Sequence, residues 1–167
     1  VCWVVENKQY ASHLAVLAHH KNIAGCLAKR LQVTLPLERI YHVDGTIPVD
    51  ARLEAIEEAK MAPSSILVGT IQSLGLGISL TKFTLAIFAE FHWSPGVMEQ
   101  VLLRFSRLDS NVPSAVYFAM VPRTIDEVIA TRLEEKFKAI NIIAATGVVG
   151  NKMEGLLDLS EADFLAG

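Results

Sequence analysis

The chain contains few cysteines and no hydrophobic run long enough to cross a membrane. Cys2 and Cys26 are its two cysteines, too few and too far apart to predict a disulfide framework or a zinc site. We expect both to be reduced and at least partly buried. No apolar run approaches the roughly 18 residues of a membrane span, and no signal peptide opens the chain. The sequence therefore predicts an intracellular protein with no membrane contact.

Charge of one sign is also scarce. The formal net charge is -3, with 15 basic and 18 acidic residues, so no global attraction to nucleic acid is expected and any contact with DNA must be local. The five histidines lack metal-ligand spacing, and we predict no metal site. The composition, 51% hydrophobic and 20% charged, predicts that part of the surface faces another domain. Because the chain begins at Val1 rather than at a methionine, and within what we expect to be the end of a helix, we expect an excised piece of a longer protein.

Apolar runs of strand length alternate with stretches of helical period, which predicts an α/β fold with a parallel sheet covered by helices. We expect strands at 13–18, 39–43, 65–69, 85–89 and 115–121. Asn22, Pro48, Pro95 and Thr124 are the expected helix starts. One domain is predicted at 1–146, followed at 147–167 by a linker and a short helical tail. The residues expected to face the core from these helices are Ile23, Cys26, Leu27, Leu31, Leu53, Ile56, Met61, Ile125, Val128, Ile129, Leu133, Phe137 and Ile140.

Polar or glycine-bearing loops follow three of the expected strands. They lie at 19–21, at 44–46 with Arg52 further on, and at 70–79. Because the carboxyl ends of parallel strands meet at one edge of the sheet, ligands of such folds usually bind there. Gly75 and Gly77 let the backbone come close to a ligand. The third glycine of a dinucleotide fingerprint is absent, so a Rossmann cofactor is not expected.

The segment at 100–107 places Gln100, Arg104 and Arg107 four and then three residues apart. With about 3.6 residues per helical turn, these positions share one face, and both guanidiniums can point at one anion. Paired arginine forks suit the charge that develops during phosphoryl transfer. For an R-x-x-R pattern taken alone, the alternative is a solvated helix face or a structural ion pair.

Segments in order along the chain resemble the Swi/Snf-type ATPases of helicase superfamily 2. Residues 66–80 are similar to motif V, and residues 100–107 fit the Q-x-x-x-R-x-x-R pattern of motif VI. Residues 88–97 are similar to the family's acidic residue, aromatic pair and W-N-P turn. Residues 16–21 resemble motif IV, residues 42–45 with Arg52 the segment after it, and T-I-D-E at 124–127 the start of the closing helix. The resemblance is to the C-terminal RecA-like lobe. Residues 88–97 are most similar to the annealing-helicase subgroup.

The resemblance implies a motor half that meets ATP across a cleft from an N-terminal RecA-like lobe of the same parent chain. That other lobe would carry the phosphate loop and the carboxylates that hold Mg²⁺. Arg107 would be the arginine finger, and Arg104 its partner on the γ-phosphate or a structural brace. Gln100 would be a polar contact in the ATP cleft, where Gly75 and Gly77 shape the loop that links nucleotide to DNA.

The implied partner is DNA, duplex or branched, held through its backbone without reading its sequence. Thr70, Gln72 and Ser73 would touch that backbone or relay the coupling. The candidate phosphate contacts are His20, Lys21 and Arg52. The resemblance places a eukaryotic parent in the nucleus and a bacterial or phage parent in the cytoplasm or nucleoid.

The chain has no G-x-x-x-x-G-K-[ST] loop and no D-E-A-H-type acidic box, so we expect no ATP hydrolysis by this piece alone. It also departs from the family after motif VI, where L-D-S at 108–110 replaces I-G-Q and Ser106 replaces a common histidine. Two alternatives stay open. One is a non-catalytic DNA- or protein-binding RecA-like module, and the other is half of a nucleotide-sugar transferase.

Overall fold

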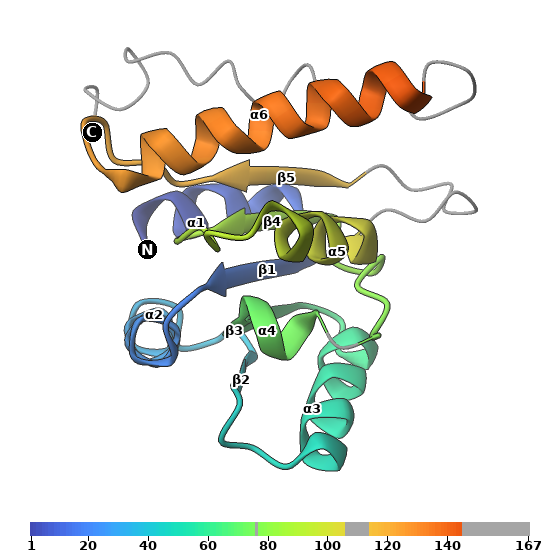
Figure 1. The fold of residues 1–167 in the computed structure, drawn as a ribbon. Helices are drawn as coiled ribbons and strands as arrows, with labels where there is room; N and C mark the ends of the chain where they lie inside the picture. The colour runs from blue at the N-terminus through green and yellow to red at the C-terminus, as the bar shows by residue number, and fades with distance from the viewer. Residues whose placement is uncertain (76, 106–113, 145–167) are drawn as a thin grey trace.

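The structure, a computed structural model, describes residues 1–75, 77–105 and 114–144, with Pro95 and 136–144 as backbone only. Its core is one five-stranded sheet in the order β2-β3-β1-β4-β5, and all four strand pairs are parallel (Figure 1). The predicted parallel α/β class is confirmed. The strands are β1 (His13–Ala18), β2 (Ile40–Val43), β3 (Ser65–Thr70), β4 (Leu85–Phe88) and β5 (Ala115–Phe118).

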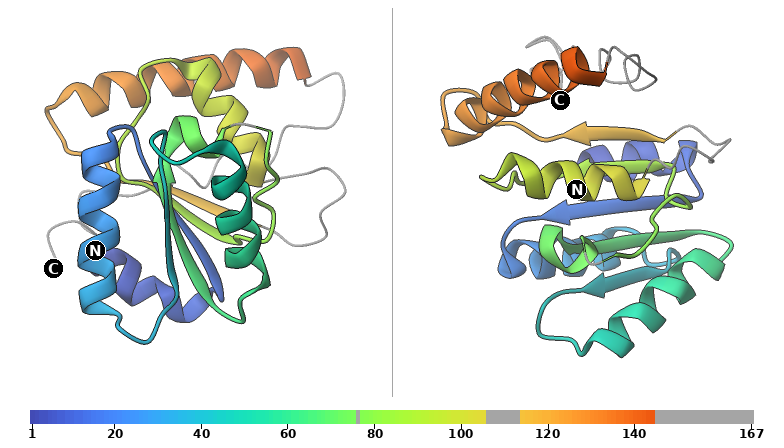
Figure 2. Two further views of the ribbon diagram at one scale, coloured as in Figure 1. Left: turned by 90° about the horizontal axis from the view of Figure 1, so that it is seen from below. Right: turned by 45° about the vertical axis from the view of Figure 1, so that its right-hand side comes forward.

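The helices lie on both faces of the sheet, as the two views in Figure 2 show. They are α1 (Cys2–Asn7), the 3₁₀ turn η1 (Lys8–Tyr10), α2 (Lys21–Thr34), α3 (Val49–Met61), α4 (Ile71–Leu74), α5 (Pro95–Phe105) and α6 (Ile125–Ala144). No helix of the described residues is both long and apolar enough to cross a membrane. The predicted linker and tail at 147–167 lie outside the described residues.

The two faces of the sheet bury two separate apolar clusters, because successive side chains of a strand point to opposite sides. In β1, Leu14 and Val16 pack with α1 and α2, whereas Ala15 and Leu17 pack with α3, α4, α5 and α6. All six residues of β1 are buried, as expected for the central strand of a sheet covered on both faces.

The buried side of α2 is confirmed for Leu31, which is fully buried, and for Leu27, which packs against the core, but not for Ile23 and Cys26. Ala24, Ala28 and Leu31 face the core, whereas Ile23 is 41% exposed. The small side chains of the two alanines let the helix lie close to the sheet. The prediction differed because the sequence periodicity favoured larger apolar residues, which lie on a neighbouring face of the helix. His20, not Asn22, occupies the cap position of this helix. Cys2 and Cys26 are free and exposed, so the prediction that both are partly buried was wrong.

The helices at the ends of the sheet also bury less than predicted. In α3, Ile56 is fully buried, but Leu53 is 40% exposed and Met61 85% exposed. In α6, Ile129 and Leu133 pack on the core, as predicted. The list of core residues was wrong for Leu53, Met61, Ile125 and Val128, which are exposed. The side chains of Phe137 and Ile140 lie outside the described residues.

The start of α6 is a variant of the predicted capping box. The Thr124 hydroxyl accepts a hydrogen bond from the Asp126 amide at 3.3 Å. The Glu127 carboxylate accepts from the amide of Arg123 at 3.0 Å, one residue before the position expected in a capping box. Arg123 has a φ of 62°, so the chain turns sharply into the helix there.

Candidate functional site

A cleft of about 660 Å³ lies at the carboxyl ends of β1 and β3 and extends to α5. Its walls come from the loops after β1, β2 and β3, which the parallel sheet brings to one edge. Every predicted DNA contact lines it, together with two residues of the predicted ATP cleft. These residues are His20, Lys21, Arg52, Thr70, Gln72, Ser73, Gly75 and Gln100.

The other predicted site residues lie elsewhere. Arg104, in the last turn of α5, does not line the cleft, and the structure leaves its Nε buried without a hydrogen-bond partner. Its carbonyl accepts a hydrogen bond from the Leu80 amide at 2.8 Å, which ties the end of α5 to the loop after α4. Gly77 lies in that loop. Arg107 falls outside the described residues.

Arg52 is the most unusual residue of the cleft. It lies in the first turns of α3 and is only 8% exposed, yet its Nε has no hydrogen-bond partner in the structure. A buried cation is costly unless it is paired and hydrogen-bonded. Because Arg52 also lines the cleft, an anion that entered there would give its guanidinium a partner.

The loop that carries His20 and Lys21 is held by Glu90, which follows β4. One carboxylate oxygen of Glu90 accepts hydrogen bonds from the amides of His19 at 3.0 Å and His20 at 2.9 Å. The other lies 2.9 Å from Nδ1 of the His20 ring. Burial alone raises the pKa of Glu90, but the hydrogen bonds from His20 and His19 outweigh it and the pKa is lowered. The ionised carboxylate thus fixes the first turn of α2 at the cleft.

His19 sits between two other imidazole rings. Its ring centroid is 4.6 Å from that of His20 and 4.9 Å from that of His92, with both pairs edge to face. Burial, followed by repulsion from His20 and His92, lowers the pKa of His19, against the attraction of Glu90. The described residues contain no group of three or more side chains that could hold a metal ion.

Thr70 and Ser73 are buried and form hydrogen bonds with each other. Thr70 caps α4, and its hydroxyl accepts a hydrogen bond from the Ser73 amide at 3.2 Å and lies 2.5 Å from the Ser73 hydroxyl. Gln72, between them, is exposed in the cleft wall. The two hydroxyls thus hold the first turn of α4 from inside, whereas the Gln72 side chain is accessible from the cleft.

The two glycines of the predicted loop have different structural roles. A Cβ at Gly75 would lie 3.2 Å from the Ile71 carbonyl and 3.2 Å from Val101, so glycine lets α4 approach α5. Gly77 adopts a φ of 74°, a conformation that L side chains rarely take. Gly75 therefore serves packing beside the cleft, and Gly77 serves the turn that follows.

Comparison with known proteins identifies the family. Residues 5–109, more than half of the chain, match the family described as helicase conserved C-terminal domain. The chain belongs to this family. Two relatives support the resemblance to Swi/Snf-type ATPases and the annealing subgroup. The SWI/SNF-related regulator of chromatin subfamily A-like protein 1 of Xenopus tropicalis is 26% identical over 89% of this chain. The DNA annealing helicase and endonuclease ZRANB3 of Mus musculus is 24% identical over 72%.

This chain matches only 14% of the length of the first relative and 11% of the length of the second. It also resembles a solved structure, the C-terminal part of the Fun30 ATPase domain, with a TM-score of 0.66 and 17% identity. That likeness covers 77% of this chain and 40% of the Fun30 chain. It shows the fold alone, and it confirms the predicted RecA-like lobe.

The sequence analysis gave no role to Glu90, which the structure places against the amides of His19 and His20 beside the cleft. A signal was present, because Glu90 follows an expected strand just as His19 and His20 do. What the sequence lacked was the strand order, in which β4 lies next to β1. That neighbourhood brings a carboxylate within reach of amides 70 and 71 residues away.

Replacing Glu90 by glutamine is expected to lower the melting temperature of the domain at neutral pH. A carboxyl group whose folded pKa lies below its ordinary value of 4.5 stabilises the fold above that value. This stability is lost as the pH falls through the folded pKa. The difference between wild type and Glu90→Gln should therefore shrink between about pH 5 and pH 3 in thermal unfolding followed by circular dichroism.

The control for this experiment is Glu6→Gln, which changes an exposed carboxylate on α1. It should leave the melting temperature at neutral pH nearly unchanged. A Glu90→Gln difference that stays constant from neutral to acid pH would show that the charge of Glu90 does not hold the loop.

Proposed function

We propose that this domain is the C-terminal motor lobe of a DNA-dependent ATPase of the Swi/Snf type. The observation that carries the proposal is the shared cleft, where the predicted phosphate contacts His20, Lys21 and Arg52 converge with the motif V residues and Gln100. The names of the relatives support it, since they include a DNA annealing helicase and a SWI/SNF-related regulator of chromatin.

The basic side chains of the cleft would hold DNA by its phosphates. Arg52 lines the cleft, while Lys21 and His20 extend from the first turn of α2, which Glu90 keeps in place. Contacts with phosphates position a duplex without reading its sequence. We therefore infer that the parent protein acts on duplex or branched DNA by its shape and charge.

The nucleotide would meet this lobe along α5. Gln100 lines the cleft, and Arg104 follows it one turn later on α5, so both residues would lie along the side of the helix that meets a phosphate chain from another domain. When bound, ATP supplies the phosphoryl group that is transferred to water. Arg107 and Arg104 would balance the charge on that group, and the Thr70–Ser73 pair would transmit its presence to the DNA contacts.

The parts that this lobe lacks would come from the N-terminal RecA-like lobe of the same parent chain. We assign Mg²⁺ and the phosphate loop to that lobe, because the 167 residues hold no Walker A sequence and no acidic box. The lobe proposed here spans residues 1–146, with 147–167 as a linker and short helical tail. The chromatin-regulator names of the relatives favour a nuclear parent protein.

The test is ATP turnover by the full-length parent protein, with and without duplex or forked DNA. We expect DNA to stimulate turnover. We also expect Arg52→Gln to raise the DNA concentration needed for half-maximal stimulation by several-fold. Loss of one phosphate contact should lower the slope of log affinity against log salt by about 0.9. Fluorescence anisotropy of labelled duplex DNA measures that slope.

The control for Arg52→Gln is Lys82→Gln, an exposed lysine just before β4, at the opposite end of the sheet from the cleft. This change should leave both measurements unaltered. Absence of DNA stimulation in the wild-type protein would refute the motor and favour a non-catalytic binding module. An Arg52→Gln variant with wild-type affinity and salt slope would show that the cleft does not hold DNA.

A further inference from the structure

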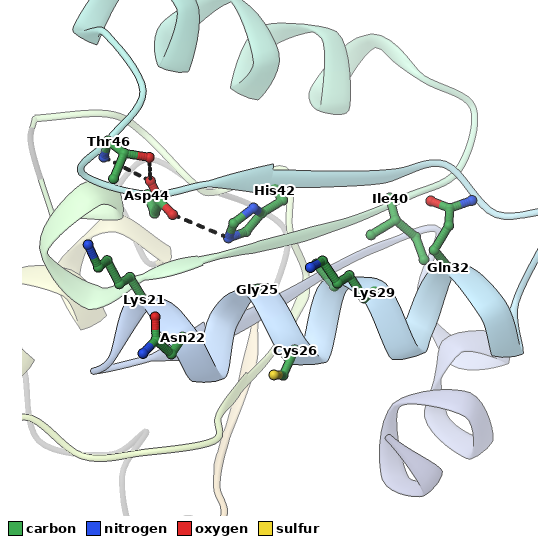
Figure 3. A pocket seen from close by; sticks show the side chains of 11 residues that line it. Lys21, Asn22, Gly25, Cys26, Lys29, Gln32, Ile40, His42, Asp44 and Thr46 are labelled. Carbon is green, nitrogen blue, oxygen red and sulfur yellow. Dashed lines mark hydrogen bonds and ion pairs between the residues drawn. The ribbon is translucent and has the colours of Figure 1, made fainter.

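A second hollow, of about 680 Å³, lies between α2 and β2 (Figure 3). We call it the β2 groove and define it by Lys21, Lys29, Gln32, Ile40 and His42. It shares only Lys21 with the cleft of the proposed motor function. Nothing in that function uses the rest of the groove.

The strand beside the groove has one free edge. β2 is the outermost strand of the sheet, and among the described strands only β3 pairs with it. Figure 2, in the view from below, shows β2 between α2 and α3, which cover its faces and not its outer edge. An edge of this kind is a template for a further strand.

The hydrogen-bond register identifies the groups on that edge. The amide of Ile66 in β3 donates to the carbonyl of Arg39 at 2.9 Å. Because alternate residues of a parallel strand face its partner, Arg39 and Tyr41 face β3. The amides and carbonyls of Ile40 and His42 therefore point away from the sheet. This edge therefore presents both amide donors and carbonyl acceptors to a further strand.

The wall opposite the strand is basic. Lys21 and Lys29 lie on one side of α2, eight residues or about 12 Å apart along the helix. Figure 3 shows their side chains on the side of α2 that faces β2, with Cys26 pointing away. Neither lysine takes part in an ion pair among the described residues.

His42 completes the groove from the strand side. Its Nε2 lies 3.8 Å from an Asp44 oxygen, too far for a hydrogen bond, and it is buried without a hydrogen-bond partner. Across from it is Gly25, where a Cβ would make ordinary van der Waals contact with the His42 ring at 3.9 Å. His42 therefore lines the groove while its Nε2 stays covered.

We propose that the β2 groove binds an extended acidic peptide of a partner protein, which adds to the sheet as a strand beside β2. The backbone of the peptide would form hydrogen bonds with the backbone of Ile40 and His42. Every second side chain of the peptide would be acidic and would lie near Lys21 and Lys29. A phosphate chain fits less well, because phosphates cannot donate to the outward carbonyls of β2.

The test is an NMR titration of the ¹⁵N-labelled 167-residue chain with a capped peptide of alternating valine and glutamate. The amides of Ile40 and His42 should shift most. Two further peptides carry N-methyl groups, one on its glutamate amides and the other on its valine amides. Since only alternate amides of an added strand face β2, one methylated peptide should lose binding while the other retains it. Equal binding of both would overturn strand addition.

Charge reversal tests the basic wall of the groove. Lys29→Glu should weaken binding of the unmethylated peptide by about three- to fivefold, the upper range for an exposed charge pair. Arg30→Glu is the matched control, because Arg30 is exposed on the same helix but does not line the groove. It should change the affinity less than about twofold.

Two other outcomes would also overturn the proposal. One is the absence of amide shifts at millimolar peptide. The other is displacement of the peptide by a thymidine oligonucleotide that shifts the same amides of Ile40 and His42, while N-methylation of the peptide has no effect on its binding. That result would identify a phosphate site. The proposed ATPase activity is measured separately, so failure of this inference and failure of the motor function are distinguishable.

Discussion

Arg107→Ala in the full-length parent protein is expected to lower DNA-stimulated ATP turnover by about 10³- to 10⁵-fold. An arginine that reaches the transferring phosphoryl group stabilises charge that is greater in the transition state than in the ground state. Its loss should therefore lower kcat far more than it raises KM. Steady-state turnover with saturating forked DNA, measured by release of inorganic phosphate, gives both constants.

Two further variants separate a finger from a structural arginine. Arg107→Lys keeps the charge but not the planar fork, so it should recover only part of the activity. Leu103→Ala changes an exposed residue of α5 and should leave turnover near the wild-type value. If Arg107→Ala retains wild-type turnover, or if its loss of activity comes with a lower melting temperature, Arg107 is not the finger.

Phe105→Ala is expected to lower the free energy of unfolding by about 3–5 kcal/mol. Phe105 ends the described part of α5, is 1% exposed and belongs to the larger apolar cluster. Its removal takes a large aromatic surface out of the core and leaves a cavity under the helix that carries Arg104. Domains are stable by only about 5–15 kcal/mol, so the variant should be close to unfolding. Urea unfolding of the 167-residue chain measures the difference.

The matched control is again on α5. Leu103 is 58% exposed, two residues from Phe105, and Leu103→Ala should change the free energy of unfolding by no more than about 0.5 kcal/mol. Similar losses for the two variants would show that α5 is not anchored through Phe105. In that case the position of Arg104 would depend on its carbonyl contact with Leu80.

The strands were predictable because they depend on local composition. β1 lies where the sequence predicts it, and the other four strands differ by at most three residues at an end. The loops at 19–21, at 44–46 with Arg52, and at 70–73 were predictable as one site, since the carboxyl ends of parallel strands must share an edge. The arginine roles still rest on the motif, because Arg107 lies outside the described residues.

The helix faces were harder to predict, because a helix with apolar residues on two sides can present either one. In α2, the sheet selects the side with Ala24 and Ala28, which permits close approach, and leaves Ile23 partly in solvent. Arg52 illustrates the same limit from the polar side. A basic residue in an α3 sequence predicts exposure, and only packing shows it nearly buried with an unpartnered Nε.

By itself, the sequence determined the parallel α/β class, the loops of the cleft and the family, since each depends on residues close together in the chain. The tertiary structure decided which distant residues meet. It placed Glu90 under the His19–His20 amides and made β2 an edge strand beside a basic groove. Strand order settles both, and that order depends on how two-sided packing of the helices buries the most apolar surface, which local periodicity does not encode.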